Sequence, residues 1–238
     1  MSGRIDVHSH LLPGIDDGCQ TLADSLRCAG ALVAAGYSQV FCTPHIWPSF
    51  PRQSVATIRQ WTGELQAELD REGIALKLHA GGEIGLRADL REKLPPERLL
   101  TFGLGNRHCL VDIWADALPP FFAPTVQWLQ SRGLTVILAH PERMKAVQDQ
   151  PELMDYFRDL GLLLQGNLQC LGENPRERRR QLAERFLSEG RYFLLGTDLH
   201  NFDTLQERLD GLSNAIGLVG ESAVDRLTVE NPRLLLPG

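Results

Sequence analysis

The chain has 238 residues, of which 43% are hydrophobic and 23% charged, with a formal net charge of −6 and a pI near 5.6. This composition is that of an ordinary globular protein, and the length suits one large core, so we expect a single domain over residues 1–238. The acidic balance argues against a nucleic-acid partner, because nucleic-acid binders usually carry a basic surplus. Basic residues cluster only at Arg176 and over 178–180, mixed with glutamates, which is typical of a solvated helix face.

Neither the N-terminus nor the cysteines indicate export. The N-terminus enters a strand-like run at once, without the basic and apolar regions of a signal peptide. No apolar run reaches the roughly 18 residues that span a membrane. The five cysteines are odd in number and widely spaced, with no C-x-x-C pair. We therefore expect a cytoplasmic protein without direct membrane insertion.

Short apolar runs rich in β-branched or aromatic residues alternate along the chain with longer amphipathic stretches. The expected strands are Ile5–His8, Gln39–Thr43, Ala75–Ala80, Cys109–Ile113, Thr135–Ala139, Leu162–Gly166 and Tyr192–Gly196. The expected helices are Thr21–Ala35, Ser54–Arg71, Phe121–Arg132, Glu152–Leu160, Pro175–Ser188 and Thr204–Gly217. This alternation predicts a parallel α/β fold. Seven repeats favour a barrel, although periodicity alone also permits an open doubly wound sheet.

Histidines and carboxylates gather at the carboxyl ends of the expected strands, where parallel barrels build their active sites. His8 and His10 are two apart on an extended segment, so both imidazoles face one side and can reach one metal ion. The other members of this group are Asp16, Asp17, His45, Glu83, Asp112, His140, Asp198 and His200. Converging carboxylates repel one another without cations between them, which predicts several metal ions. Imidazole mixed with carboxylate suits Mn²⁺, Fe or Zn²⁺ better than Ca²⁺.

His79 and His108 lie inside or at the start of a strand, and we expect both to be structural. Trp47, Phe50 and Trp114 fall near the expected mouth of the site. They are candidates for stacking on a substrate ring, although packing explains such aromatic residues more often.

Taken together, the motifs resemble those of the polymerase and histidinol phosphatase (PHP) superfamily. Within it they are most similar to the bacterial manganese-dependent protein tyrosine phosphatases associated with capsule and exopolysaccharide genes. The resemblance covers nearly the whole chain and is carried by Ile-Asp-Val-His-Ser-His-Leu-Leu-Pro-Gly-Ile-Asp-Asp-Gly (5–18), Thr-Pro-His (43–45), Gly-Gly-Glu-Ile (81–84), Ala-His-Pro-Glu-Arg (139–143) and Thr-Asp-Leu-His-Asn (197–201). It implies a distorted (β/α)7 TIM-like barrel of the PHP type and a phosphatase acting on a phosphotyrosine protein, with a bacterial tyrosine kinase as the expected partner.

The resemblance also implies a ligand set for three divalent metal ions, with Mn²⁺ expected and Fe or Zn²⁺ as alternatives. The set is His8, His10, Asp17, His45, Glu83, Asp112, His140, Asp198 and His200. His10 and Asp198 are expected to act in catalysis as well. Asp17 is preferred to Asp16 because it precedes Gly18 in the matching motif. Asp112 stands where the family usually has glutamate.

Arg143 matches the arginine that grips the substrate phosphate in the family, and we expect it to be catalytic and substrate-binding. The family's second arginine, a few residues after the last histidine, is missing. Arg208, which comes a turn later, is the remaining candidate for substrate binding. Metal ions would activate water and neutralise charge, and Arg143 would contact the phosphoryl oxygens. Glu142 and a metal-bound water are the candidate proton donors.

Other functions stay open. The spacing of Cys170 and Arg176 is that of cysteine phosphatases, but Pro175 removes a backbone amide and Glu173 adds a repelling charge. A small-molecule phosphomonoesterase of the histidinol phosphatase kind is an alternative, as is a metal-dependent nuclease, which the acidic charge disfavours. No expected strand ends in the lysine that amidohydrolases commonly carboxylate. A metal-binding regulator without turnover has no need of so many gathered charges. The oligomeric state is left open by the sequence.

Overall fold

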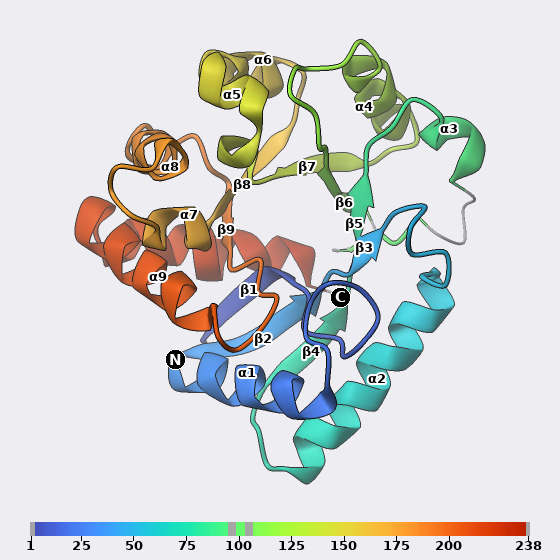
Figure 1. Ribbon diagram of the computed structural model, residues 1–238, viewed down its shortest axis with the longest axis vertical. Helices are drawn as coiled ribbons and strands as arrows, with labels where there is room; N and C mark the ends of the chain where they lie inside the picture. The colour runs from blue at the N-terminus through green and yellow to red at the C-terminus, as the bar shows by residue number, and fades with distance from the viewer. Residues whose placement is uncertain (1–2, 95–98, 103–106, 237–238) are drawn as a thin grey trace.

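The computed structural model describes residues 3–94, 99–102 and 107–236 (Figure 1). Each pair of neighbouring strands in these ranges is parallel. One sheet has the order β1-β2-β4 and a second has the order β3-β5-β6-β7-β8-β9. Helices surround the strands on the outside of the molecule. The expected parallel α/β class is thereby confirmed.

The strands lie where the apolar runs predict them, within two residues at each end. Their bounds are β1 (Arg4–Ser9), β2 (Tyr37–Cys42), β3 (His45–Ile46), β4 (Lys77–Ala80), β5 (Glu83–Gly85), β6 (His108–Asp112), β7 (Thr135–Ala139), β8 (Leu163–Asn167) and β9 (Leu194–Gly196). The short β3 and β5 were not expected. Two or three residues are too few to show a periodic apolar pattern, and both strands carry site residues instead.

The two additional strands continue β2 and β4 after short breaks, so the nine segments correspond to seven strands with two interruptions. The first break contains Pro44, which has no N–H for a ladder. The second contains Gly81 and Gly82, where a Cβ would lie 2.9 Å from Thr43 Cγ2 and 2.4 Å from Ile46 Cδ1 respectively. A parallel bridge between Ser9 and Leu199 connects the two sheets at β1 and β9. The seven expected repeats are therefore present, two of them with broken strands.

All six expected helices are present as α1 (Leu22–Ala34), α2 (Val55–Arg71), α4 (Phe122–Ser131), α6 (Leu153–Asp159), α8 (Arg178–Ser188) and α9 (Leu205–Val219). The Thr21 side chain caps α1 by accepting from the Asp24 N–H, and Gly36 follows that helix with φ of 89°. The short helices α3 (Leu90–Lys93), α5 (Lys145–Asp149), α7 (Leu168–Gly172) and α10 (Glu221–Asp225) were not expected. They are too short for a helical period to be visible in the sequence.

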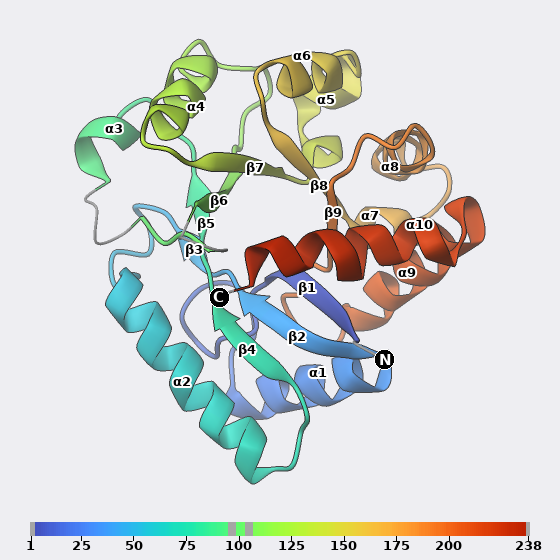
Figure 2. The same cartoon turned by 180° about the vertical axis from the view of Figure 1, so that it is seen from behind.

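Two apolar clusters hold the strands in place. The larger cluster packs the strands against the helices, with members such as Leu32 of α1, Leu69 of α2 and Phe186 of α8. The smaller lies among the strands and includes Val7, Phe41, Leu110, Ile137 and Leu194 with the C-terminal Leu235. Figure 2 shows the segment from α10 onward running across the back of β1 and β9. Among the described residues, no helix has both the length and the apolar character needed to cross a bilayer.

Candidate metal centre and active site

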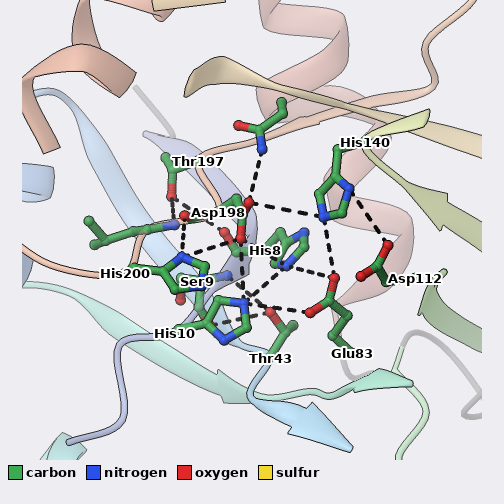
Figure 3. Close-up of polar contacts among 12 residues, drawn as sticks. His8, Ser9, His10, Thr43, Glu83, Asp112, His140, Thr197, Asp198 and His200 are labelled. Atoms are coloured by element: carbon green, nitrogen blue, oxygen red, sulfur yellow. Dashed lines mark hydrogen bonds and ion pairs between the residues drawn. The ribbon is translucent and has the colours of Figure 1, made fainter. Parts of the chain in front are cut away.

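The carboxyl ends of the strands bring predicted ligands together. Figure 3 shows His8, His10, Glu83, Asp112, His140, Asp198 and His200 gathered there. Three groups of side chains place one potential ligand atom per residue within 4.8 Å of one another. They are His10, Asp17, His45 and His200; His8, His10 and Asp198; and His8, Glu83 and His140. Asp112 belongs to none of these groups, but its Oδ1 lies 3.8 Å from His140 Nδ1. Eight of the nine predicted ligands are therefore placed to share cations, and Asp112 stands beside them.

Glu83, at the start of β5, is a carboxylate surrounded by imidazoles. Its Oε1 lies 3.5 Å from His8 Nε2 and 3.3 Å from His140 Nε2, and its Oε2 lies 2.6 Å from His45 Nδ1. Within the described part of the chain, neither oxygen accepts a well-directed hydrogen bond, although the side chain is buried. Asp112 Oδ2 and His45 Nδ1 are likewise buried without a well-directed hydrogen bond to any described residue. Buried polar atoms are normally satisfied, so these donor atoms fit bound cations.

Asp198 follows β9 and contacts both histidines of the first strand. Its Oδ1 lies 3.4 Å from the Nε2 atoms of His8 and His10. Its Oδ2 accepts hydrogen bonds from Arg143 Nη1 at 2.5 Å and from Asn167 Nδ2 at 2.9 Å. Burial opposes ionisation, but the surrounding His8, His10 and Arg143 hold the pKa of Asp198 well below its usual range. The carboxylate is therefore in the charged form that binds metal.

Backbone strain is concentrated at this end of the strands. His140 has φ of 33° and Asp198 has φ of 52°, and they are the non-glycine residues with positive φ in the described ranges. Such conformations cost on the order of 1–3 kcal/mol when the surroundings hold them in place. Both strained residues are predicted ligands, so the fold maintains an unfavourable backbone in order to aim these side chains.

A second layer of hydrogen bonds orients the imidazoles. His10 Nδ1 donates to Asp16 Oδ2 at 2.8 Å, and His8 Nδ1 donates to Gln165 Oε1 at 2.8 Å, which leaves both Nε2 atoms facing the cluster. Asp17 instead places its Oδ1 at 3.1 Å from His45 Nε2, and its side chain is 61% exposed. This geometry supports the preference for Asp17 as a ligand and gives Asp16 the task of orienting His10.

Sequence reasoning did not find Gln165 or Asn167, although both contact ligands directly. A signal was present, because the two polar side chains stand two apart in the otherwise apolar β8 and so face the same side. Asn167 also caps α7, since its Oδ1 accepts from the Gln169 N–H at 2.8 Å. Polar residues inside a strand are therefore as informative here as those after its end.

The two candidate arginines have different surroundings. Arg143, in the 3₁₀ turn Pro141–Arg143 after β7, lines the cavity above the cluster, and its side chain is 26% exposed. Arg208 of α9 is buried, and its guanidinium donates to the carbonyls of Thr197, Asp198 and Thr204 and to Gln169 Oε1. These bonds hold the β9 loop to the helix. Arg208 also lines the cavity above the cluster, but backbone carbonyls and Gln169 occupy most of its donors, so substrate binding by Arg208 stays a prediction.

Two other candidates are turned away from the site. The buried Glu142 carboxylate accepts from the Asn167 N–H at 2.7 Å and from Tyr192 Oη at 2.9 Å, so its prediction as a proton donor is wrong in this geometry. Cys170 is also buried, and burial together with Glu142 and Glu173 raises the pKa of its thiol well above the usual range. A neutral buried thiol is a poor nucleophile, which argues against cysteine phosphatase chemistry.

Aromatic rings stand at the mouth. Trp47 packs 4.5 Å from the His45 ring and meets Trp114 edge to face at 6.2 Å, while Phe50 stacks on His45 at 5.8 Å. Trp114 is 70% exposed. His79 lies apart from the cluster, where its Nε2 contacts Gln39 Oε1 at 2.7 Å, as expected of a structural histidine.

Comparisons with known proteins agree with this geometry. A sequence model of the capsular polysaccharide synthesis family CpsB/CapC matches residues 4–237. Tyrosine-protein phosphatase YwqE of Bacillus subtilis (strain 168) is 27% identical over 236 residues, covering 98% of this chain and 91% of YwqE. Tyrosine-protein phosphatase CpsB of Streptococcus agalactiae serotype V is 24% identical over 241 residues, covering 98% of each chain.

One solved structure has a TM-score of 0.87 and 25% identity, and covers 97% of this chain and 94% of that one. It comes from crystal structures of YwqE from Bacillus subtilis and CpsB from Streptococcus pneumoniae, described as unique metal-dependent tyrosine phosphatases. The similarity therefore extends over the whole fold and includes the strands that carry the cluster.

Proposed function

This chain belongs to the capsular polysaccharide synthesis family CpsB/CapC, and from that premise we propose that it is a metal-dependent phosphatase that hydrolyses phosphotyrosine. The observation that carries the proposal is the buried Glu83 carboxylate, whose oxygens face four imidazoles and accept no well-directed hydrogen bond from the described residues. Relatives named as tyrosine-protein phosphatases support the reaction class.

The proposed ligand set holds three divalent metal ions, with Mn²⁺ preferred and Fe or Zn²⁺ as alternatives. The three groups of side chains around the cluster support this number, and Asp112 would complete the set beside His140. When bound, such ions lower the pKa of water toward about 7 and neutralise charge on a phosphoryl group.

Arg143 is the proposed phosphate-binding residue. Burial alone would lower its pKa, but Asp198 and neighbouring carboxylates raise the pKa overall, so the guanidinium stays charged. It lies at the rim of a cavity of about 270 Å³ that the cluster also lines. A planar guanidinium can donate two parallel hydrogen bonds to phosphoryl oxygens, and these strengthen as negative charge builds up. His10 and Asp198 are the proposed catalytic partners because they meet below this cavity.

The leaving group favours an aryl phosphate. Since Glu142 points away from the site, a substrate that needs little protonation of its leaving oxygen fits best. A phenol has a pKa of about 10, far below that of an alkyl alcohol, so tyrosine leaves more easily than serine.

The proposed physiological substrate is a phosphotyrosine protein, namely a bacterial tyrosine kinase of polysaccharide production. The description of the family supports this setting. A cytoplasmic location is proposed with it, because the five cysteines are free thiols. Residues 1–238 would act as one catalytic domain.

The test is hydrolysis of p-nitrophenyl phosphate, a phosphotyrosine peptide and its phosphoserine counterpart by chelator-stripped protein. Mn²⁺, Fe²⁺, Zn²⁺ and Mg²⁺ are restored in turn, and bound metal is measured alongside. We expect activity only after metal is restored, with the phosphotyrosine peptide preferred. Metal binding without turnover of either peptide would reject the phosphotyrosine assignment and leave small phosphomonoesters to be tested.

A further inference from the structure

A second cavity of about 440 Å³ adjoins the metal centre on the β7 side. It shares Asp112, Trp114, His140 and Arg143 with the cavity above the cluster, so the two cavities adjoin each other. The rest of its lining includes residues that play no part in the metal centre, such as Lys145 of α5 and Arg179 of α8. A substrate group held at the cluster therefore lies next to this second cavity.

The second cavity has a basic lining in an otherwise acidic protein. Arg143, Lys145 and Arg179 contribute three cations, whereas Asp116 is the only acidic residue, besides the predicted ligand Asp112, among the described residues that line the cavity. The protein as a whole carries a net charge of −6. Such a local reversal of sign attracts an anionic group.

The ion pairs of these cations leave donors for a ligand. Arg179 Nη2 contacts Glu173 Oε1 at 2.9 Å, and Lys145 Nζ contacts Asp149. Each contact engages one nitrogen of a side chain that offers several N–H donors. Both basic side chains are partly exposed, at 41% for Arg179 and 56% for Lys145. The Lys145–Asp149 pair is exposed on both sides and is therefore weak, whereas Arg179 uses one nitrogen on the buried Glu173 and keeps its other N–H donors for a ligand.

Trp114 lines both cavities. Its indole is 70% exposed, although large apolar side chains are normally covered, and Arg143 lies 5.8 Å from its ring centre. An exposed tryptophan offers an apolar face to a substrate ring. Lys145 and Arg179 line only the second cavity and not the one above the cluster. The arrangement suits a ligand that has an aromatic group at the cluster and a charge further along.

We propose that the basic cavity, defined by Trp114, Arg143, Lys145 and Arg179, is a subsite for a second anionic group located close to the phosphotyrosine in the substrate chain. This inference rests on the proposed function and adds a substrate preference to it. The anionic group is either an acidic side chain or a second phosphate, since both present oxygens to guanidinium and ammonium groups in the same way. Neutral flanking sequences would leave Lys145 and Arg179 without a ligand.

The experiment compares kcat/KM for a neutral phosphotyrosine peptide with that for peptides carrying one glutamate, placed in turn up to roughly three residues on either side, a reach of about 10 Å. A second series carries another phosphotyrosine at the same positions. We expect the best anionic peptide to exceed the neutral one about fivefold, as for one partly exposed charged contact. The preference should fall as salt is raised from about 0.01 M to 1 M.

Lys145→Gln combined with Arg179→Gln should bring the ratio of anionic to neutral peptide close to one. Because each ratio is taken within one protein preparation, a loss of folded enzyme cancels. The matched control is Arg176→Gln combined with Lys77→Gln, which removes the same two charges from exposed positions that do not line the cavity. We expect this control to keep the wild-type ratio.

The outcomes separate the two proposals. Hydrolysis of phosphotyrosine peptides with equal kcat/KM for neutral and anionic sequences would overturn the subsite and leave the phosphatase intact. A preference that survives in the double variant would also overturn it, since other residues would then be responsible. A gain with glutamate identifies acidic side chains as the ligand, and a gain only with the second phosphotyrosine identifies phosphate. No turnover of any phosphotyrosine peptide would overturn both proposals.

Discussion

The two ends of the strands satisfy their polar groups in opposite ways. At the amino end of β1, Arg4 Nη1 donates to Asp225 Oδ1 at 2.5 Å and to Thr228 Oγ1 at 2.8 Å, so charge and hydrogen-bonding capacity are matched within the protein. At the carboxyl ends, the oxygens of Glu83 are buried among histidines without a well-directed hydrogen bond from any described residue. The polar groups at the amino end find their partners within the protein, whereas those at the carboxyl ends need cations as partners. The difference separates residues kept for stability from those kept for chemistry.

The largest expected effect is at the carboxyl end. His8→Ala removes an imidazole that belongs to two of the three ligand groups, so we expect metal content to fall and phosphatase activity to drop roughly 10³-fold. Metal analysis and p-nitrophenyl phosphate hydrolysis, measured on the same preparation, check this. Cys170→Ser is the control and should leave both values near those of the wild type. If Cys170→Ser abolished activity while His8→Ala kept it, the metal mechanism would be wrong.

Substitutions of Arg143 distinguish a residue that binds the substrate phosphate from one that binds metal. Arg143→Met should lower kcat/KM for a phosphotyrosine peptide about 10²-fold, because a donor aimed at the phosphoryl oxygens is lost. Metal content should change little, since Arg143 contacts Asp198 but belongs to none of the ligand groups. Arg143→Lys should recover part of the loss through its charge without restoring the two-pronged contact. If Arg143→Met lost metal to the same extent as activity, Arg143 would instead act by holding the Asp198 carboxylate in position.

At the amino end of the strands we expect a substitution to lower stability and leave activity unchanged. Arg4→Met removes the hydrogen bonds to Asp225 and Thr228 and should lower the free energy of unfolding by about 1–2 kcal/mol. Turnover of the folded enzyme should stay unchanged. Urea unfolding and steady-state kinetics measure the two quantities separately. A change in kcat without a change in stability would show that the two ends are coupled.

The smallest effect concerns a histidine outside the cluster. Burial, with a smaller contribution from Lys77, lowers the pKa of His79 to about 4. The unfolded chain binds this proton below about pH 6.5, so stability should decrease as the pH falls from 6.5 toward 4. His79→Gln should remove this part of the pH dependence, by no more than about 1 kcal/mol because the site is partly exposed. Urea midpoints of both metal-free proteins at pH 7 and pH 5 give the comparison, and identical pH dependence would contradict it.

The sequence was sufficient for the strands, the longer helices and the convergence of the ligands. Apolar runs set the strand positions, and His8, His45, His140 and Asp198 could be located because they directly follow or end such runs. Spacing alone did not separate Asp16 from Asp17. That distinction depends on how the loop folds back to place Asp16 against His10 Nδ1, which is a tertiary contact.

Features that depend on side-chain direction were harder to predict. Glu142 follows His140 in the motif but turns toward Tyr192, and Arg208 turns inward to backbone carbonyls. Both residue types look functional beside a metal site. Glu142 instead meets Asn167 and Tyr192, 25 and 50 positions away, and Arg208 is held by carbonyls of the loop just before its own helix. The breaks that create β3 and β5 were also unpredicted. The first contains Pro44, and the second contains Gly81 and Gly82, whose close packing against Thr43 and Ile46 is a tertiary contact.

The junction of β1 with β9 has a consequence for biosynthesis. The Thr197 hydroxyl contacts Asp6, 191 positions away in the chain, and the Asp198 N–H donates to the His8 carbonyl beside it. At a translation rate of about 5–20 residues per second, these partners leave the ribosome roughly 10–40 s apart. The nascent chain therefore exposes its first two histidines long before Asp198 exists. The proposed metal cluster is complete only after the last strand is made, so we expect a prematurely terminated chain lacking β9 to be inactive.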